Sequence, residues 1–252
     1  MNAILYICHG SRVKQAVKEA GAFIDRVMKK VEAPIQELGF LELAEPSLEE
    51  GFKRCVEQGA STIMAVPVLL LTAAHAKEDI PSELHALQAR FPNIEVRLGH
   101  PIGVHEKIVD VLLERIIETS IPVKENAMVL LVGRGSSDLD VKRDLTKIAN
   151  LFSEKSMIKH VEVCFLAVAE PSLDHALERT KQVDVEQVFV IPYLFFTGIL
   201  MKKIEGRLEK INEKTGPDYI LCQYLGYHPL VEDILIEQTR ELLHKRGINH
   251  GK

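Results

Sequence analysis

An internal duplication restricts the fold of this chain more than any other feature of its sequence. Residues 4–11 read ILYICHGS, and residues 129–136 read VLLVGRGS. The motif EPSL begins at Glu45 and again at Glu170. Both matches have an offset of 125 residues, about half the length of the chain, so the 252 residues contain two copies of one unit.

Two further matches follow in the same order. Residues 66–72 (VPVLLLT) return as residues 191–197 (IPYLFFT), again at an offset of 125. The His-Pro pair at residues 100–101 returns at residues 228–229, where the offset is 128. We attribute the change of three residues to a loop insertion in the second copy.

Each copy alternates strand-like and helix-like patterns. Continuous apolar runs of β-rich composition predict strands, and apolar residues spaced three and four apart, such as Val13, Val17, Ala20 and Ile24, predict amphipathic helices. Runs that are apolar throughout are typical of parallel strands covered on both faces. The sequence therefore predicts an α/β fold with four parallel strands per copy. The predicted strands are residues 3–8, 39–44, 62–71 and 94–98 in the first copy, and 127–133, 161–167, 187–196 and 219–224 in the second. The further predicted helices of the first copy are residues 47–58, 82–90 and 104–118.

We expect two domains, residues 1–120 and 121–252, joined by a linker at about residues 120–126. Pro67 and Pro192 fall inside predicted central strands, where proline removes a donor from the hydrogen-bond ladder. Because both copies share this proline, we predict a strand end or a bulge there.

Composition restricts the functional class. A net charge of −5 argues against wholesale nucleic-acid binding, and no segment approaches the roughly 20 apolar residues of a membrane helix. The four cysteines are scattered and form no metal-binding or disulfide pattern. We expect a cytoplasmic protein with no membrane and no nucleic-acid partner.

Candidate ligands follow the predicted strands of the first copy. His9 ends the first strand, Glu42 and Glu45 end the second, and the third delivers Thr72 and His75. The carboxyl ends of parallel strands meet at one edge of a sheet, where ligands collect. Two histidines and a carboxylate suit an exchangeable divalent ion, because they leave coordination positions open.

The second copy keeps the scaffold without these side chains. Arg134 replaces His9, Ala167 replaces Glu42 and Leu200 replaces His75. Folding therefore does not require the histidines. Glu45 has a counterpart in Glu170, which also allows a structural role at the start of the following helix and makes Glu42 the better ligand candidate.

The loops after the first strand of each copy could attract an anion or simply cap a helix. Gly10-Ser11-Arg12 and its counterpart near Arg134 place backbone amides between a strand and a helix. Several cations could give the rim of the site a positive charge: Arg12, Lys14, Lys77, Arg134, Lys202 and Lys203.

These residues resemble a known family. HGSR at 9–12, FLEL at 40–43 and LLLTAAHAK at 69–77, with GRGSSD at 133–138 and PYLFFTG at 192–198, resemble the sirohydrochlorin chelatases of the long, fused class (class II chelatases). The likeness is closest to the siroheme-pathway ferrochelatases of bacilli. In this family, relatives used for cobalamin synthesis often carry a histidine-rich tail or a cysteine cluster. The C-terminal region here has only His244 and His250, so the resemblance favours siroheme synthesis.

The resemblance implies two flavodoxin-like domains that face across a cleft, with the metal on the first domain. It implies a lyase that inserts a divalent ion, Fe2+ or else Co2+ or Ni2+, into sirohydrochlorin with release of two protons. The ion is a substrate, and no permanently bound cofactor is expected. His9, His75 and Glu42 are the expected catalytic and metal-binding residues. The expected tetrapyrrole contacts are Glu45, Leu70, Leu71, Thr72, Ala73, Ala74, His75, Ser11, Arg12 and Arg134.

The chain contains no P-loop motif, so insertion is expected not to require ATP. Fusion of two copies predicts a functional monomer. Three alternatives remain open: a cobaltochelatase of cobalamin synthesis, a non-catalytic metal carrier, and a phosphoryl-transfer enzyme with His9 as nucleophile beside Arg12.

Overall fold

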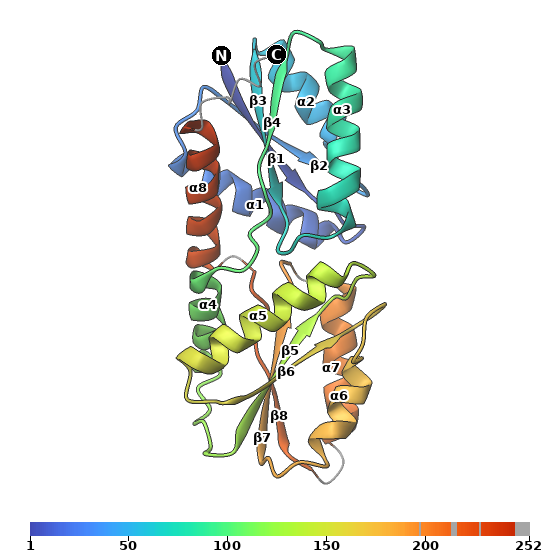
Figure 1. The fold of residues 1–252 in the computed structure, drawn as a ribbon, viewed down its shortest axis with the longest axis vertical. Coiled ribbons are helices and arrows are strands. Elements are labelled where there is room, and N and C mark those ends of the chain that lie inside the picture. Colours follow the sequence, from blue (N-terminus) through green and yellow to red (C-terminus); the bar gives the residue numbers. More distant parts are fainter. Residues whose placement is uncertain (197, 213–215, 227, 245–252) are drawn as a thin grey trace. The chain divides into compact units, whose positions relative to one another are not determined.

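Each copy of the duplicated sequence supplies the strands of one parallel four-stranded sheet (Figure 1). The computed structural model describes residues 1–196, 198–212, 216–226 and 228–244. Thr197, part of the third repeat match, and His250 lie outside these residues.

In chain order the elements of the first copy are β1 (Asn2–Cys8), α1 (Lys14–Lys30), β2 (Ile35–Phe40), α2 (Leu48–Glu57), β3 (Thr62–Val68), the π-helical turn η1 (His75–Asp79), α3 (Ile80–Arg90), β4 (Glu95–Leu98) and α4 (Glu106–Ile117). Those of the second copy are β5 (Ala127–Gly133), α5 (Leu139–Lys155), β6 (His160–Phe165), α6 (Leu173–Thr180), β7 (Gln187–Tyr193), α7 (Ile199–Asn212), β8 (Asp218–Leu221) and α8 (Pro229–His244).

The two sheets have the same topology. Their strand orders are β2-β1-β3-β4 and β6-β5-β7-β8, and every pairing is parallel. In the first sheet α2 and α3 cover one face and α1 and α8 the other, and in the second α6 and α7 lie opposite α4 and α5 (Figure 1). The predicted α/β class with two duplicate parallel sheets is confirmed. In the described part of the chain, no helix is both long enough and apolar enough to cross a bilayer.

The central strands are buried along their lengths, as their continuous apolar sequences predict. Every residue of β3 is buried, as is every residue of β1 after Asn2. Pro67 lies one residue before the end of β3, beyond the last pairing of β3 with β4 at Ala65, so the predicted strand end is correct. Pro192 holds the equivalent position in β7.

The second strand lies earlier in the sequence than we predicted. The structure places β2 at Ile35–Phe40 rather than at residues 39–44, and residues 41–47 form the loop that follows it. β2 is an edge strand with half-buried polar side chains, including Gln36 and Glu37, so it lacks the continuous apolar run of a central strand. The predicted strands 62–71, 187–196 and 219–224 likewise end early, at Val68, Tyr193 and Leu221.

The compact units of the structure differ from the predicted domains 1–120 and 121–252. One unit contains Met1–Ile102 together with α8 from Glu232 onward, and the other contains Gly103–Val231. The last helix of each sequence copy therefore belongs to the unit built on the other copy's sheet. The apolar stripe of a helix shows that it packs but does not show on which sheet, so sequence periodicity could not reveal this exchange.

Ion pairs and hydrogen bonds attach α8 to the first unit. The Glu232 carboxylate is 2.8 Å from Arg26 Nε and 2.6 Å from Lys30 Nζ, both on α1. Arg240 donates to the Lys30 carbonyl at 2.7 Å, and Gln238 donates to the carbonyl of Pro101 at 3.3 Å.

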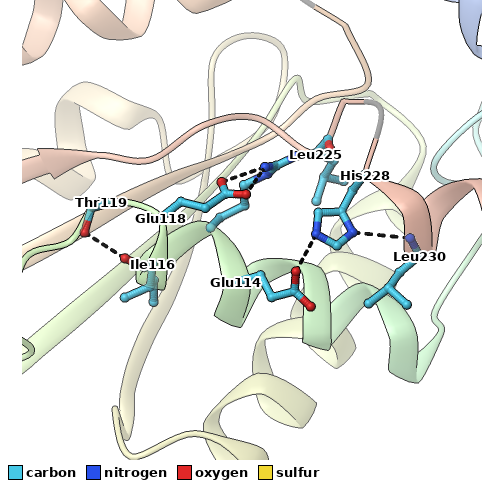
Figure 2. Close-up of polar contacts among 8 residues, drawn as sticks. Glu114, Ile116, Glu118, Thr119, Leu225, His228 and Leu230 are labelled. Carbon is cyan, nitrogen blue, oxygen red and sulfur yellow. Dashed lines mark hydrogen bonds and ion pairs between the residues drawn. The ribbon is translucent and has the colours of Figure 1, made fainter.

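The beginning of α8 is held inside the second unit (Figure 2). His228 Nδ1 accepts a hydrogen bond from the Leu230 amide at 3.3 Å, and His228 Nε2 lies 2.8 Å from Glu114 Oε2 on α4. Arg115, also on α4, donates to the Leu225 carbonyl at 2.7 Å. His105 caps α4 as His228 caps α8, since its Nδ1 accepts from the Lys107 amide at 3.1 Å.

The structure corrects the predicted pairing of the His-Pro motifs at residues 100–101 and 228–229. Glu95 in β4 and Asp218 in β8 hold the same register position, so the offset there is 123 (218 − 95). At this offset His228 corresponds to His105, and their identical capping roles agree. Up to this point the second copy is therefore two residues shorter than the first, rather than three residues longer.

Candidate metal centre

Three side chains of the first unit meet at the carboxyl edge of its sheet. His9 Nε2 lies 3.1 Å from His75 Nε2 and 3.5 Å from Glu42 Oε1. The two imidazole rings are nearly perpendicular, with centroids 4.5 Å apart. In the described residues these three side chains form a group whose ligand atoms all lie within 4.8 Å of one another and could hold a metal ion. The structure thus brings together the three candidates that the sequence placed after separate strands.

Backbone contacts fix His9 relative to Glu42. The Glu42 amide donates to the His9 carbonyl at 3.1 Å, and the Leu41 amide donates to the Cys8 carbonyl at 2.8 Å, so the loop after β2 continues the pairing with β1. Gly10 has a φ of 94°, and a Cβ at this residue would lie 1.7 Å from the Glu42 carbonyl oxygen. Only glycine allows the two loops to approach this closely.

The Nδ1 contacts of both histidines turn Nε2 toward the centre of the group. His9 Nδ1 is 3.2 Å from the Gly10 carbonyl oxygen, and His75 Nδ1 is 2.7 Å from Asp79 Oδ2. A carbonyl or carboxylate oxygen can only accept, so each contact places a hydrogen on Nδ1. In the neutral rings two Nε2 atoms without hydrogens then lie only 3.1 Å apart. A cation between them would remove this unfavourable contact.

The separations fit one ion bound by all three groups. Two nitrogens that are each about 2.1 Å from an ion subtend an angle of about 95° when they lie 3.1 Å apart. For His9 Nε2 and Glu42 Oε1, at 3.5 Å, the same bond length gives about 113°. These angles place the ligands on one side of the ion and leave other positions open, as in a two-histidine, one-carboxylate facial arrangement. The side chains are partly exposed, at 27% for His9, 31% for His75 and 45% for Glu42, so an ion could enter and leave.

Cys8 precedes His9 but does not join the group. Burial raises the pKa of the Cys8 thiol to about 12, so it stays a neutral thiol at physiological pH. The thiolate is the form that binds metals, so the donor set is nitrogen and oxygen only.

A match to a family model decides the relationship of this chain to known proteins. The CbiX model matches twice, over residues 3–119 and 128–242. The chain belongs to the CbiX family. The two CbiX matches also agree with the internal duplication, although the compact units exchange their last helices.

Relatives of this CbiX chain support the resemblance to the long sirohydrochlorin chelatases. It is 52% identical to the sirohydrochlorin ferrochelatase of Priestia megaterium, covering 98% of this chain and 92% of the relative. It is 45% identical to the sirohydrochlorin ferrochelatase of Bacillus subtilis, covering 95% and 91%. The solved structure of SirB from Bacillus subtilis with Fe3+ matches with a TM-score of 0.90 at 44% identity, covering 96% of each chain.

The second CbiX copy repeats the backbone of the site without the candidate ligands. The Ala167 amide donates to the Arg134 carbonyl at 3.0 Å, as Glu42 does to His9, and Gly135 has the same φ of 94°. Arg134 and Ala167 are exposed, whereas Leu200, which replaces His75, packs against the core of the second unit.

The other predicted substrate contacts of the CbiX chain occupy loops beside the metal group or lie in the second unit. Ser11 and Arg12 follow His9, and Ser11 Oγ accepts from the Val13 amide at 3.1 Å in the loop before α1, so it does not cap this helix, whose N-cap residue is Val13. The loop of Leu70, Leu71, Thr72, Ala73 and Ala74 joins β3 to η1, and these residues are half-buried except Ala74, which is exposed. Arg134 belongs to the second unit.

Glu45 takes part in the start of α2. Its carboxylate accepts from the Ser47 amide at 2.9 Å, as Glu170 accepts from the Ser172 amide at 2.7 Å. A hydrogen bond with Glu50 raises the pKa of Glu45 above its ordinary value. A structural role explains why both copies keep this residue, and its contact with a tetrapyrrole stays a prediction.

Sequence reasoning missed Asp79. The signal that could have revealed it is its spacing of four residues from His75, which brings two side chains to the same face of a helical turn.

Proposed function

We propose that this chain inserts a divalent metal ion, Fe2+ in the first place, into sirohydrochlorin and releases two protons. The observation that carries the proposal is the pair of Nε2 atoms 3.1 Å apart, with the Glu42 carboxylate beside them. The full-length relatives at 52% and 45% identity are ferrochelatases, whereas the Priestia megaterium sirohydrochlorin cobaltochelatase is 33% identical, which favours iron over cobalt.

The residues perform three tasks in this reaction. His9 and His75 hold the ion through neutral imidazole, and Glu42 completes a set of three ligands that leaves the tetrapyrrole side of the ion open. When the ion transfers to the ring, the two imidazoles and the carboxylate regain free lone pairs. These groups can then accept the two pyrrole protons at the place where they are released.

The remaining features of the proposed function rest on the sequence. We propose that insertion proceeds without ATP and without a resident cofactor, that the protein acts as a monomer in the cytoplasm, and that Arg12 and the loop from Leu70 to Ala74 contact the tetrapyrrole. The phosphoryl-transfer alternative is less favourable. The Glu42 carboxylate lies 3.5 Å from His9 Nε2, so its negative charge would repel a phosphoryl group that approaches this nitrogen.

An insertion assay tests the proposal. Sirohydrochlorin is incubated anaerobically with Fe2+, Co2+ or Ni2+ and the protein, and the absorbance of the ring is followed. We expect many turnovers for the wild type. His9→Ala and His75→Ala should each lower the rate of insertion at least about 100-fold, since removal of a residue that only supports a metal ligand already lowers metal affinity or activity about 10–100-fold. Fe2+ should give the highest kcat/KM of the three ions.

The matched control is His85→Ala, which removes an exposed histidine of α3 in the same unit and should leave turnover unchanged. Retention of half the wild-type rate by either ligand variant would contradict the proposed ligands. Stoichiometric metal binding without turnover would identify a metal carrier instead.

A further inference from the structure

The first unit has one more residue than the second in the segment that follows His75. The segments correspond at an offset of 125 as far as Lys77, because Lys77 donates its amide hydrogen to the Ala73 carbonyl as Lys202 does to that of Gly198. The buried core positions that follow correspond at an offset of 124: Ile80 with Ile204, Leu84 with Leu208, and Leu87 with Ile211. The extra residue therefore lies between Lys77 and Ile80.

The π-helical turn η1 accommodates this residue. The Ile80 amide donates to the His75 carbonyl, a hydrogen bond over five residues instead of the four of an α-helix. One more residue thus fits into the turn without changing how α3 packs on the sheet. In the second unit Lys203 stands alone between Lys202 and Ile204, and α7 is α-helical through this region.

The added residue brings a carboxylate to a metal-ligand candidate. Asp79 Oδ2 accepts from His75 Nδ1 at 2.7 Å, which fixes both the tautomer and the ring orientation and directs Nε2 toward His9. Lys203 and Ile204 occupy the corresponding part of the second unit, where Leu200 replaces the histidine, so the extra residue and the carboxylate occur together with the ligand.

We infer that Asp79, carried by the one-residue insertion in η1, is a positioning residue that orients His75 for the exchangeable metal. The inference rests on the proposed function. A hydrogen-bonded carboxylate behind a ligating histidine holds the ring in place and raises its basicity, and loss of such a partner lowers metal affinity about 10–100-fold.

Two variants separate this role from a general charge effect. Asp79→Ala removes the acceptor, whereas Asp79→Asn keeps an amide oxygen that can accept the same hydrogen bond. Glu78→Gln is the matched control, because Glu78 is an exposed carboxylate in the same turn. Co2+ affinity is measured without sirohydrochlorin from the visible absorption of the bound ion, and kcat and the KM for the metal are measured with it.

We expect Asp79→Ala to weaken Co2+ binding about 10–100-fold and to raise the KM for the metal more than it lowers kcat. Asp79→Asn should recover most of the affinity, and Glu78→Gln should match the wild type. All three variants should keep the wild-type melting temperature, since the Asp79 side chain is 52% exposed.

The inference is overturned if Asp79→Ala binds Co2+ as tightly as Glu78→Gln, or if Asp79→Asn is as weak as Asp79→Ala. A wild-type protein that neither binds Co2+ nor inserts metal would overturn the proposed function itself. The two failures are therefore distinguishable.

Discussion

Gly10 and Gly135 give the loop after the first strand the same backbone conformation in both units. Both have a φ of 94°, and a Cβ would lie 1.7 Å from the Glu42 carbonyl oxygen in one case and 1.8 Å from that of Ala167 in the other. The backbone requirement is the same in both units, but only Gly10 lies beside metal-ligand candidates.

Replacing each glycine by alanine should therefore distinguish an effect on stability, expected for both variants, from an effect on metal binding, expected for Gly10→Ala alone. We expect Gly10→Ala and Gly135→Ala each to lower the free energy of unfolding by at least about 1–3 kcal/mol, because alanine is strained at this φ and clashes with the facing carbonyl. Only Gly10→Ala should also weaken Co2+ binding, since it separates His9 from Glu42. Urea unfolding and a Co2+ titration measure the two effects, and equal Co2+ affinity in both variants would contradict this reading of the loop.

The sequence predicted His9, Glu42 and His75 because each follows a strand, and the ends of parallel strands meet at one edge. It did not predict Asp79, although the spacing of four residues from His75 was visible in the sequence. The π-helical turn itself could not be predicted, because it comes from one additional residue rather than from any residue preference. The additional residue is identified by the buried core positions of the two units, which correspond at an offset of 124 after η1.

Among the strands, the uniformly buried β1 and β3 were predicted near their observed positions, as was the partly exposed β4, whereas the edge strand β2 was placed too late in the sequence. β1 and β3 are covered on both faces, so their sequences are apolar throughout. β2 lies at the edge of the sheet and contains polar residues, so its sequence does not form the apolar run that predicts a strand. Helix α1 was predicted from a stripe of which Ala20, Ile24 and Val27 are buried, whereas Val13 and Val17 are only half-buried.

Deletion of Glu78 tests the role of η1 as an element. The deletion leaves one residue between Lys77 and Ile80, as in the second unit, so the segment should become α-helical while the core contacts of α3 remain. We expect a melting temperature close to that of the wild type and a Co2+ affinity at least about 10-fold lower, because the spacing of His75 and Asp79 falls from four residues to three and the carboxylate shifts away from Nδ1. A deletion variant that binds Co2+ as the wild type does would show that the π-helical turn is dispensable.

For the whole molecule, the exchange of α4 and α8 could not be predicted from the sequence. Both helices carry an apolar face that either sheet could accept, and the two sheets share one topology. The polar contacts of Glu232 with α1 are specific to the observed arrangement. The Glu232 side chain is only 4% exposed and accepts from both Arg26 and Lys30.

Glu232 should make the stability of the first unit depend on pH. Burial alone would raise the pKa of Glu232, but the hydrogen bonds from Lys30 and Arg26 outweigh it and hold the pKa below its ordinary value of 4.5. The stabilisation is therefore complete above that value and is lost as the pH falls through the lowered pKa. Glu232→Gln should cost about 1.5–3 kcal/mol at neutral pH, the usual contribution of hydrogen bonds between charged groups. Urea unfolding of both proteins at about pH 7 and about pH 3 should show the difference shrinking in acid, and a constant difference would contradict the assignment.

The exchange of terminal helices also sets the order in which the protein can mature during translation. The sheet that carries His9 and His75 is synthesised before the second sheet, yet α8, which covers one of its faces, is synthesised after the second sheet. The second unit has all its segments as soon as residue 231 leaves the ribosome, whereas the first unit must also wait for α8 from Glu232 onward. A nascent chain stalled before Glu232 would thus present a finished half without the candidate metal ligands and an unfinished half that contains them.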